Sequence, residues 1–276
     1  GKALDLSQSS AVEGFTGKIK GTNDFSQMRN SDVIIITAGL PRQPGMSRDD
    51  LLETNGKIIK KISLDIKKYS PKAFVICITN PLDAMVYVLQ KYSKLPKNMC
   101  VGMAGVLDSS RMKFFLSEVL DVSINDVETF VLGGHGDDMV PLVNYTTIGG
   151  IPLMEYIKIK KVPISKINKI VDRTRMGGGE IVKLLKKGSA FYAPASSAIQ
   201  MAEAYLLDQK KILPCAAFLN GQYNLKNMYM GVPTIIGSKG IEKIIEVKLS
   251  SNEKSMLKKS VKSVQSLVDA VEKILK

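Results

Sequence analysis

Two short apolar runs near the start of the chain are typical of buried parallel strands. Residues 33–36 and 73–78 are rich in β-branched side chains, are too short for helices, and are each followed by turn-forming residues. Between them, apolar residues recur at helical spacing, at positions 51, 52, 58, 59, 62 and 66. The pattern therefore predicts a strand–helix–strand unit. A further helix near 81–92 and a strand near 100–103 extend it.

Beyond Asp108 the pattern becomes a mixture of helices and short strands. We expect a helix through the apolar positions 112, 115, 116 and 119, a strand at 129–132, and helices at 164–187 (interrupted by glycines 177–179) and 196–207. Strands near 215–219, 228–232 and 234–236 precede an amphipathic C-terminal helix, whose apolar positions are 257, 261, 264, 268, 271 and 275. The chain is therefore predicted to be an α/β protein with a parallel-sheet domain over residues 1–105 and a mixed α+β domain over residues 106–276.

Composition narrows the class of protein. The 276 residues carry a net charge of +13, but there is no Trp and no basic–aromatic stripe, which disfavours nucleic-acid binding. A basic surface can instead steer an anionic substrate. No apolar run reaches the roughly 18 residues that a membrane span needs. The three cysteines are widely spaced, so we expect neither a disulfide scaffold nor a metal site, and a reducing, cytoplasmic compartment fits best.

Two loops are placed where an open parallel sheet binds its ligands, beyond the carboxyl ends of the strands. The first, residues 37–48, carries Arg42 and Arg48 among prolines and glycines, and the second covers residues 79–83. Because a guanidinium can bind a carboxylate through two N–H groups, the first loop suits an anionic substrate. A polar surface loop without function would have the same composition.

The only histidine, His135, stands in the motif GGHGDD at the end of a predicted strand. Its pKa of about 6.5 suits proton transfer near neutrality, and the flanking glycines allow close approach of a ligand. A lone histidine is nevertheless more often structural. In the motif VLDSSR, Asp108 could be a helix N-cap or first-turn residue, and Arg111 could extend along the surface to solvent. These residues separately leave both interpretations open.

Together, the motifs resemble the lactate/malate dehydrogenase family, and most closely bacterial malate dehydrogenases that are similar in sequence to lactate dehydrogenases. The similarity rests on TAGLPRQPGMSRDDLLETN, ITNPLD, GMAGVLDSSR, LGGHGDDMVPL, KGSAFYAPASSAIQMAEAYLLD and VPTIIGSKG, in the order of the family. It implies a doubly wound Rossmann-type sheet followed by a substrate domain, NAD as cofactor, a small dicarboxylate substrate, a homo-oligomer (dimer or tetramer) and a place in the tricarboxylic acid cycle.

The resemblance also implies roles for individual residues. His135 would be the general acid/base, and Asp108 would fix its tautomer and stabilise the imidazolium. Arg111 would bind the C1 carboxylate, Arg48 would polarise the C2 oxygen, and Asn80 would hydrogen-bond near the same centre.

The cofactor contacts follow in the same way. The resemblance implies that Asn55, Ile78, Thr79 and Asn80 contact the nicotinamide cofactor, with the backbone at Gly39 passing close to it.

One position is expected to separate malate from lactate. In the family, the residue six positions before Arg48 faces the variable end of the substrate, and lactate-type enzymes carry Gln there. This chain carries Arg42, with Gln43 beside it. A second positively charged side chain in the site would pair with a second carboxylate on the substrate, so the resemblance implies (S)-malate and oxaloacetate as the substrate pair.

The family opens with a strand, a G-x-G-x-x-G turn, a helix, a second strand and an acidic residue that binds the adenosine ribose, whereas this sequence matches from just after that region. We therefore expect this polypeptide, made alone, to bind NAD weakly, and to be inactive or to aggregate; the sequence does not decide between NAD and NADP. Lactate dehydrogenase, an inactive fragment of such an enzyme and a basic binding module are the alternatives.

Overall fold

A six-stranded sheet forms the centre of the computed structural model, which describes residues 1–41 and 48–276 and only the backbone of Arg48 and Asp49. Its strands are ordered β1 (Val33–Ile36), β2 (Phe74–Cys77), β3 (Cys100–Gly102), β9 (Lys211–Asn220), β10 (Lys226–Gly237) and β11 (Gly240–Ile244). The first three pair in parallel, and β9 joins β3 antiparallel. The strand order confirms the predicted α/β fold, with strands from the second half extending the same sheet.

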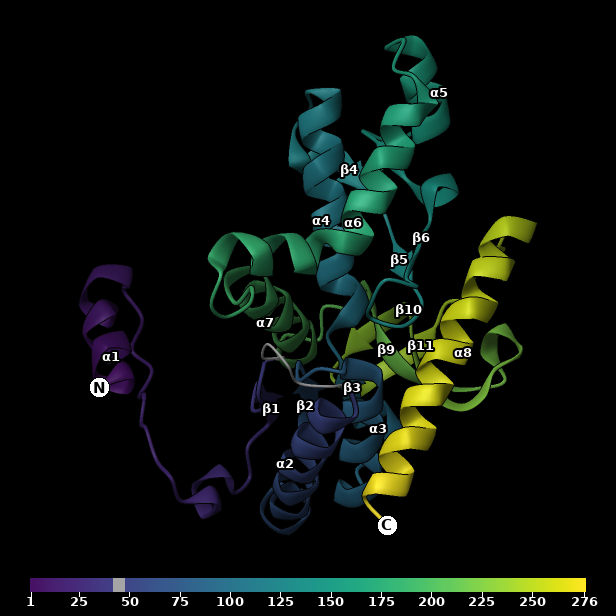
Figure 1. Cartoon of the computed structure of the whole chain (residues 1–276). Coiled ribbons are helices and arrows are strands. Elements are labelled where there is room, and N and C mark those ends of the chain that lie inside the picture. Colours follow the sequence, from purple (N-terminus) through teal and green to yellow (C-terminus); the bar gives the residue numbers. More distant parts are fainter. Residues whose placement is uncertain (42–47) are drawn as a thin grey trace.

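Helices cover both faces of this sheet (Figure 1). On one face pack α2 (Arg48–Tyr69), α3 (Leu82–Ser93) and α8 (Ser251–Ile274), and on the other packs α7 (Tyr192–Leu206). Side chains along β2 alternate between the two, since Val75 belongs to the first core and Phe74 to the second. Both faces are apolar, which is why the strand reads as a continuous hydrophobic run.

A second group of elements stands above the sheet in Figure 1. The helices α4 (Ala104–Leu120), α5 (Leu153–Ile159) and α6 (Ile164–Leu185) share an apolar core with the short strands β4 (Val127–Glu128), β5 (Val131–Leu132) and β7 (Thr147–Ile148). The remaining short strands are β6 (Val140–Pro141) and β8 (Ile151–Pro152). The 3₁₀ turns are Phe25–Met28, Lys97–Met99, Ile124–Asp126, Val143–Tyr145 and Gln222–Asn224.

Three sequence expectations need correction. Glycines 177–179 do not interrupt a helix, because α6 runs through them, although Figure 1 shows it bending along its length. The strands expected at 228–232 and 234–236 are one strand, β10, in which Pro233 faces Pro214 of β9. The strand expected at 129–132 begins only at Val131. The domain boundary near residue 105 stays a prediction.

The N-terminal helix α1 (Lys2–Glu13) stands apart from the other helices in Figure 1 and has no buried residue. In the part of the chain that the structure describes, no helix is long and apolar enough to cross a membrane. Within the same residues, no cluster of His, Cys, Asp and Glu could hold a metal ion. All three cysteines are buried and free.

Candidate active site

The loops that follow β1 and β2 meet at the carboxyl ends of these parallel strands. The side chain of Asn55, on α2, joins them: its Oδ1 accepts the Leu40 N–H at 2.8 Å, and its Nδ2 donates to the carbonyl oxygens of Leu40 at 3.1 Å and Asn80 at 2.7 Å. The Thr79 hydroxyl donates to the Ala38 carbonyl at 2.6 Å. These bonds hold the backbone at Ala38 and Leu40 against the segment at Thr79 and Asn80, at the edge where open parallel sheets bind ligands.

His135 lies in a loop that neighbouring elements hold at each residue. The main chain of Gly133 pairs with Gly231 of β10, the Gly134 N–H donates to Ser260 Oγ of α8 at 2.8 Å, and the His135 N–H donates to Asp83 Oδ2 of α3 at 2.9 Å. A Cβ at Gly134 would come within 2.5 Å of Val264 Cγ2. Glycine at position 134 therefore allows the loop to pack directly against α8, and this contact explains the second glycine of the motif.

The imidazole of His135 is paired with a buried carboxylate. Its Nδ1 lies 2.8 Å from Asp108 Oδ2, and the side chains are 16% and 2% exposed. Because a carboxylate only accepts, Nδ1 must donate, which leaves Nε2 for a ligand. Asp108 lies in the second turn of α4, whose N-cap is Met103, so the alternative interpretation of Asp108 as an N-cap is wrong.

The pKa of His135 is raised above its ordinary value. Burial alone lowers it, but the charge and hydrogen bond of Asp108, with a further contribution from the charge of Asp83, more than offset burial and the opposing charge of Arg111. The arrangement therefore stabilises the protonated imidazole relative to that of a free histidine.

Arg111 completes the cluster. Its Nη1 donates to Asp108 Oδ1 at 3.2 Å, and its side chain is only 12% exposed, so it does not extend to solvent. The side chain passes over Gly177 of α6, where an added Cβ would lie 3.0 Å from Arg111 Cδ. The Arg111 Nε is buried and has no hydrogen-bond partner among the described residues. A buried guanidinium with an unused donor suits an anionic ligand.

Asp83 is a second buried carboxyl beside His135, and the sequence interpretation did not select it. It lies in the first turn of α3, is 3% exposed, and its Oδ1 has no hydrogen-bond partner within the described part of the chain. Burial raises the pKa of Asp83 to about 6, against the lowering effect of the hydrogen bond and charge of His135. The motif ITNPLD includes Asp83, but it indicates no role for this residue, because the hydrogen-bond partner is 52 residues away in the sequence.

The other predicted residues are placed less completely. Arg42 lies outside the described residues, and of Arg48 only the backbone, at the start of α2, is described. Ile78 is half-buried, Asn80 is exposed and Leu40 is 43% exposed at the edge of the two loops. Apolar and amide side chains are of the kinds that line a site for the nicotinamide ring of NAD, so Leu40, Ile78 and Asn80 are the residues that could hold it.

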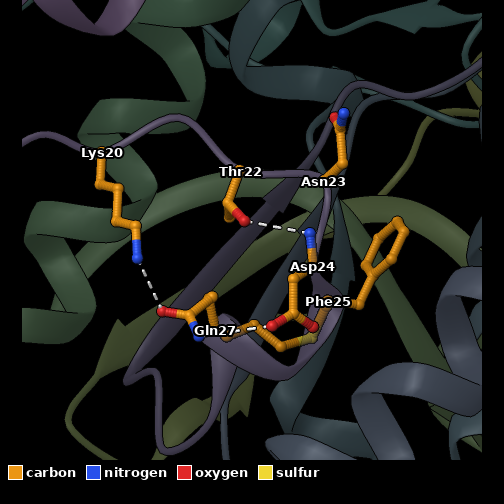
Figure 2. Close-up of a pocket in the computed structure, with 7 residues that line it drawn as sticks. Lys20, Thr22, Asn23, Asp24, Phe25 and Gln27 are labelled. Carbon is orange, nitrogen blue, oxygen red and sulfur yellow. Dashed lines mark hydrogen bonds between the residues drawn. The ribbon is translucent and has the colours of Figure 1, made fainter.

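The hollow in Figure 2 lies elsewhere. It has a volume of about 490 Å³ and is lined by residues from Lys20 to Met28, with Lys20 Nζ donating to Gln27 Oε1 at 3.1 Å. The nearby Asn30 N–H donates to the Tyr69 carbonyl at the C-terminal end of α2, so this region lies near the amino end of β1. Ligands of open parallel sheets bind at the opposite edge.

Comparison with known proteins matches almost the whole chain. Residues 1–102 match the NAD binding domain of lactate/malate dehydrogenases, and residues 105–275 match the alpha/beta C-terminal domain. A malate dehydrogenase of Cryptosporidium parvum is 52% identical with a TM-score of 0.96, covering 99% of this chain and 87% of that one. A lactate dehydrogenase of the same organism, solved with lactic acid and nicotinamide adenine dinucleotide, is 46% identical with a TM-score of 0.95 over 99% and 86%. The malate dehydrogenase of Plasmodium falciparum is 41% identical with a TM-score of 0.96 over 100% and 87%.

Proposed function

The chain belongs to the lactate/malate dehydrogenase family, whose members are NAD-dependent 2-hydroxy acid dehydrogenases, and we propose that it interconverts (S)-malate and oxaloacetate. The observation that carries the chemistry is the 2.8 Å pair between His135 and the buried Asp108, beside an Arg111 with an unused donor. This pair supplies an oriented acid/base, and the arginine supplies an anion-binding group.

Proton transfer is the task of His135. In the oxidative direction its neutral Nε2 accepts the proton of the C2 hydroxyl, and the imidazolium that forms is stabilised by Asp108. NAD, when bound, would supply the acceptor for the hydride that leaves C2. In the reductive direction the imidazolium returns the proton to the C2 oxygen, and its raised pKa favours this protonated starting form. A positioned acid/base contributes about 10² to 10⁴ in rate.

Substrate orientation is the proposed task of the arginines. Arg111 binds the C1 carboxylate, for which it offers a buried guanidinium whose Nε has no hydrogen-bond partner among the described residues. Arg48 polarises the C2 oxygen, and Asn80 donates to the same region. Asn55, whose amide joins Leu40 to Asn80, and Thr79, whose hydroxyl donates to Ala38, hold the cofactor-binding loops in place, while Ile78 and the backbone at Gly39 contact the cofactor.

The choice of malate rests on Arg42, which the sequence places at the position that meets the variable end of the substrate. A guanidinium there pairs with the C4 carboxylate of oxaloacetate, whereas pyruvate leaves it unpaired in a closed site. Lactate dehydrogenase is the second candidate, since a lactate dehydrogenase is 46% identical to this chain. A homo-oligomer in the cytoplasm remains a prediction.

Kinetics with NADH test this proposal. We expect kcat/KM to be higher for oxaloacetate than for pyruvate, and Arg42→Gln to lower this ratio by about 10² to 10³, the cost of leaving a buried charge unpaired. Gln43→Ala is the matched control, because the neighbouring residue should leave the ratio unchanged. An unaltered ratio in Arg42→Gln, or a comparable change in Gln43→Ala, would overturn the assignment of malate.

A further inference from the structure

A neutral side chain at position 83 could make the same structural contact as Asp83, so that contact does not account for the charge. One of its oxygens accepts the His135 N–H at 2.9 Å, and the other is buried without a partner among the residues described. An asparagine could accept the same hydrogen bond through its carbonyl oxygen. Because a buried and incompletely paired carboxylate is costly, the negative charge itself requires an explanation.

The position of Asp83 connects two parts of the site. It lies three residues after Asn80, whose carbonyl is held by Asn55 in the loop that follows β2. Its carboxylate reaches the loop of His135, where a Cβ at Gly134 would lie 3.3 Å from Asp83 Oδ2. The same side chain therefore ties the proton-transfer residue to the segment expected to contact nicotinamide.

We propose that Asp83 is a positioning residue that fixes the backbone of His135 and, through its negative charge, favours the protonated imidazole. His135 then faces two carboxylates from different helices: Asp108 of α4 at the ring, and Asp83 of α3 at the main chain. The inference rests on the proposed role of His135 in proton transfer.

Among the side chains that the structure describes, the charged groups that act most on His135 come from α3 and α4. Asp108, Asp83 and Arg111 act on the pKa of His135, and His135 and Asp108 act on that of Asp83. From α8, the side chains that meet this loop at Gly133 and Gly134 are Ser260 and Val264, which are neutral. The effect of Asp83 on the imidazole can therefore be separated from that of the packing around it.

Two substitutions separate charge from anchoring. Asp83→Asn removes the charge and keeps an acceptor for the His135 N–H. Ser260→Ala removes the oxygen that accepts the adjacent Gly134 N–H, a hydrogen bond of 2.8 Å, and changes no charge. A purely structural role for Asp83 predicts that the two variants behave alike, whereas the proposal predicts that they differ.

The single histidine makes the measurement direct, since a sample labelled at histidine gives one imidazole signal, that of His135. We expect an NMR titration of the full chain to give a pKa for His135 that is lower by about 0.5 to 1 pH unit in Asp83→Asn, and unchanged in Ser260→Ala. Far-UV circular dichroism checks that each variant is folded. An unchanged pKa in Asp83→Asn, or equal shifts in both variants, would overturn the proposal.

A kinetic measurement distinguishes failure of this inference from failure of the proposed function. For malate oxidation, the lower limb of kcat/KM against pH should move to lower pH in Asp83→Asn by the same amount as the NMR titration. If the wild type oxidised neither malate nor lactate while the NMR shift persisted, the proposed function would fail and the link between Asp83 and His135 would stand. A kinetic limb that stayed in place despite dehydrogenase activity would contradict the role of Asp83 in proton transfer.

Discussion

Asp83→Asn should change the pH dependence of stability in a predictable direction. In the folded chain burial raises the pKa of Asp83 from 3.8 to about 6. Because the folded-state pKa is the higher one, folding favours the protonated carboxyl. The contribution of Asp83 to stability is therefore complete below pH 3.8 and is lost as the pH rises through 6. An asparagine does not titrate and has no such dependence.

The magnitude follows from the two pKa values. The change from 3.8 to about 6 corresponds to about 3 kcal/mol of folding free energy lost above pH 7, at about 1.36 kcal/mol per pH unit. Between pH 4.5 and pH 7.5 the wild type should lose about 2 kcal/mol relative to Asp83→Asn. The unpaired amide NH₂ of the asparagine costs about 1 to 3 kcal/mol, but this penalty is independent of pH and cancels in the comparison.

Urea unfolding at 25 °C, followed by circular dichroism at several pH values, measures this difference. Asp138→Asn is the matched control in the same loop, since the Lys259 ion pair and the Ser263 hydrogen bond lower the pKa of Asp138. Its contribution is present above the unfolded pKa and is lost as the pH falls, so its pH dependence has the opposite sign. Repeating Asp83→Asn in a His135→Gln background removes the coupled titration of the imidazole.

The reasoning is refuted if the difference between Asp83→Asn and wild type is the same from pH 4.5 to pH 7.5. It is also refuted if the variant gains relative stability toward low pH, since that is the behaviour of an ion-paired carboxylate such as Asp138. Either result would mean that Asp83 is not a carboxyl whose ionised form is destabilised by burial.

Three further substitutions test the rest of the site. Asp108→Asn leaves burial as the main influence on the imidazole, so the pKa of His135 should fall below 6.5 in an NMR titration and kcat should fall by about 10² to 10⁴; an unchanged pKa would exclude the pair. Arg111→Lys retains the charge but loses the two-point contact, so KM for oxaloacetate should rise about 10- to 100-fold at unchanged melting temperature, and an unchanged KM would remove Arg111 from the carboxylate site. Gly134→Ala brings a Cβ within 2.5 Å of Val264 Cγ2, so activity should fall and be partly restored by Val264→Ala; failure of this rescue would place the strain elsewhere.

Strand β2 could be predicted from the sequence because it is buried on both faces, whereas β1 was predicted from its apolar run alone, since its Ile35 is 39% exposed. The runs at residues 33–36 and 73–78 leave no polar position for a helix surface, and the structure places β1 and β2 there. The glycines of α6 were misleading for a physical reason. Glycine is a poor helix former, but at Gly177 it leaves room for the side chain of Arg111, which packs against the helix. Only the tertiary contact distinguishes glycines that end a helix from glycines that make room for a neighbouring side chain within a continuous helix.

The two carboxyls beside His135 have different contacts that could not be predicted from the local sequence. Asp108 and Asp83 are the same residue type, each near the start of a helix that follows a strand of the sheet, and local pattern treats them alike. Their roles differ because Asp108 reaches the ring and Asp83 reaches the main chain of a residue that is distant in sequence from both. Asp108 was selected only through its place in a family motif. Asp83 was identified from the structure, because one of its carboxylate oxygens is buried and has no hydrogen-bond partner among the described residues. This energetic cost, which a motif does not reveal, is the observation on which the proposed role of Asp83 rests.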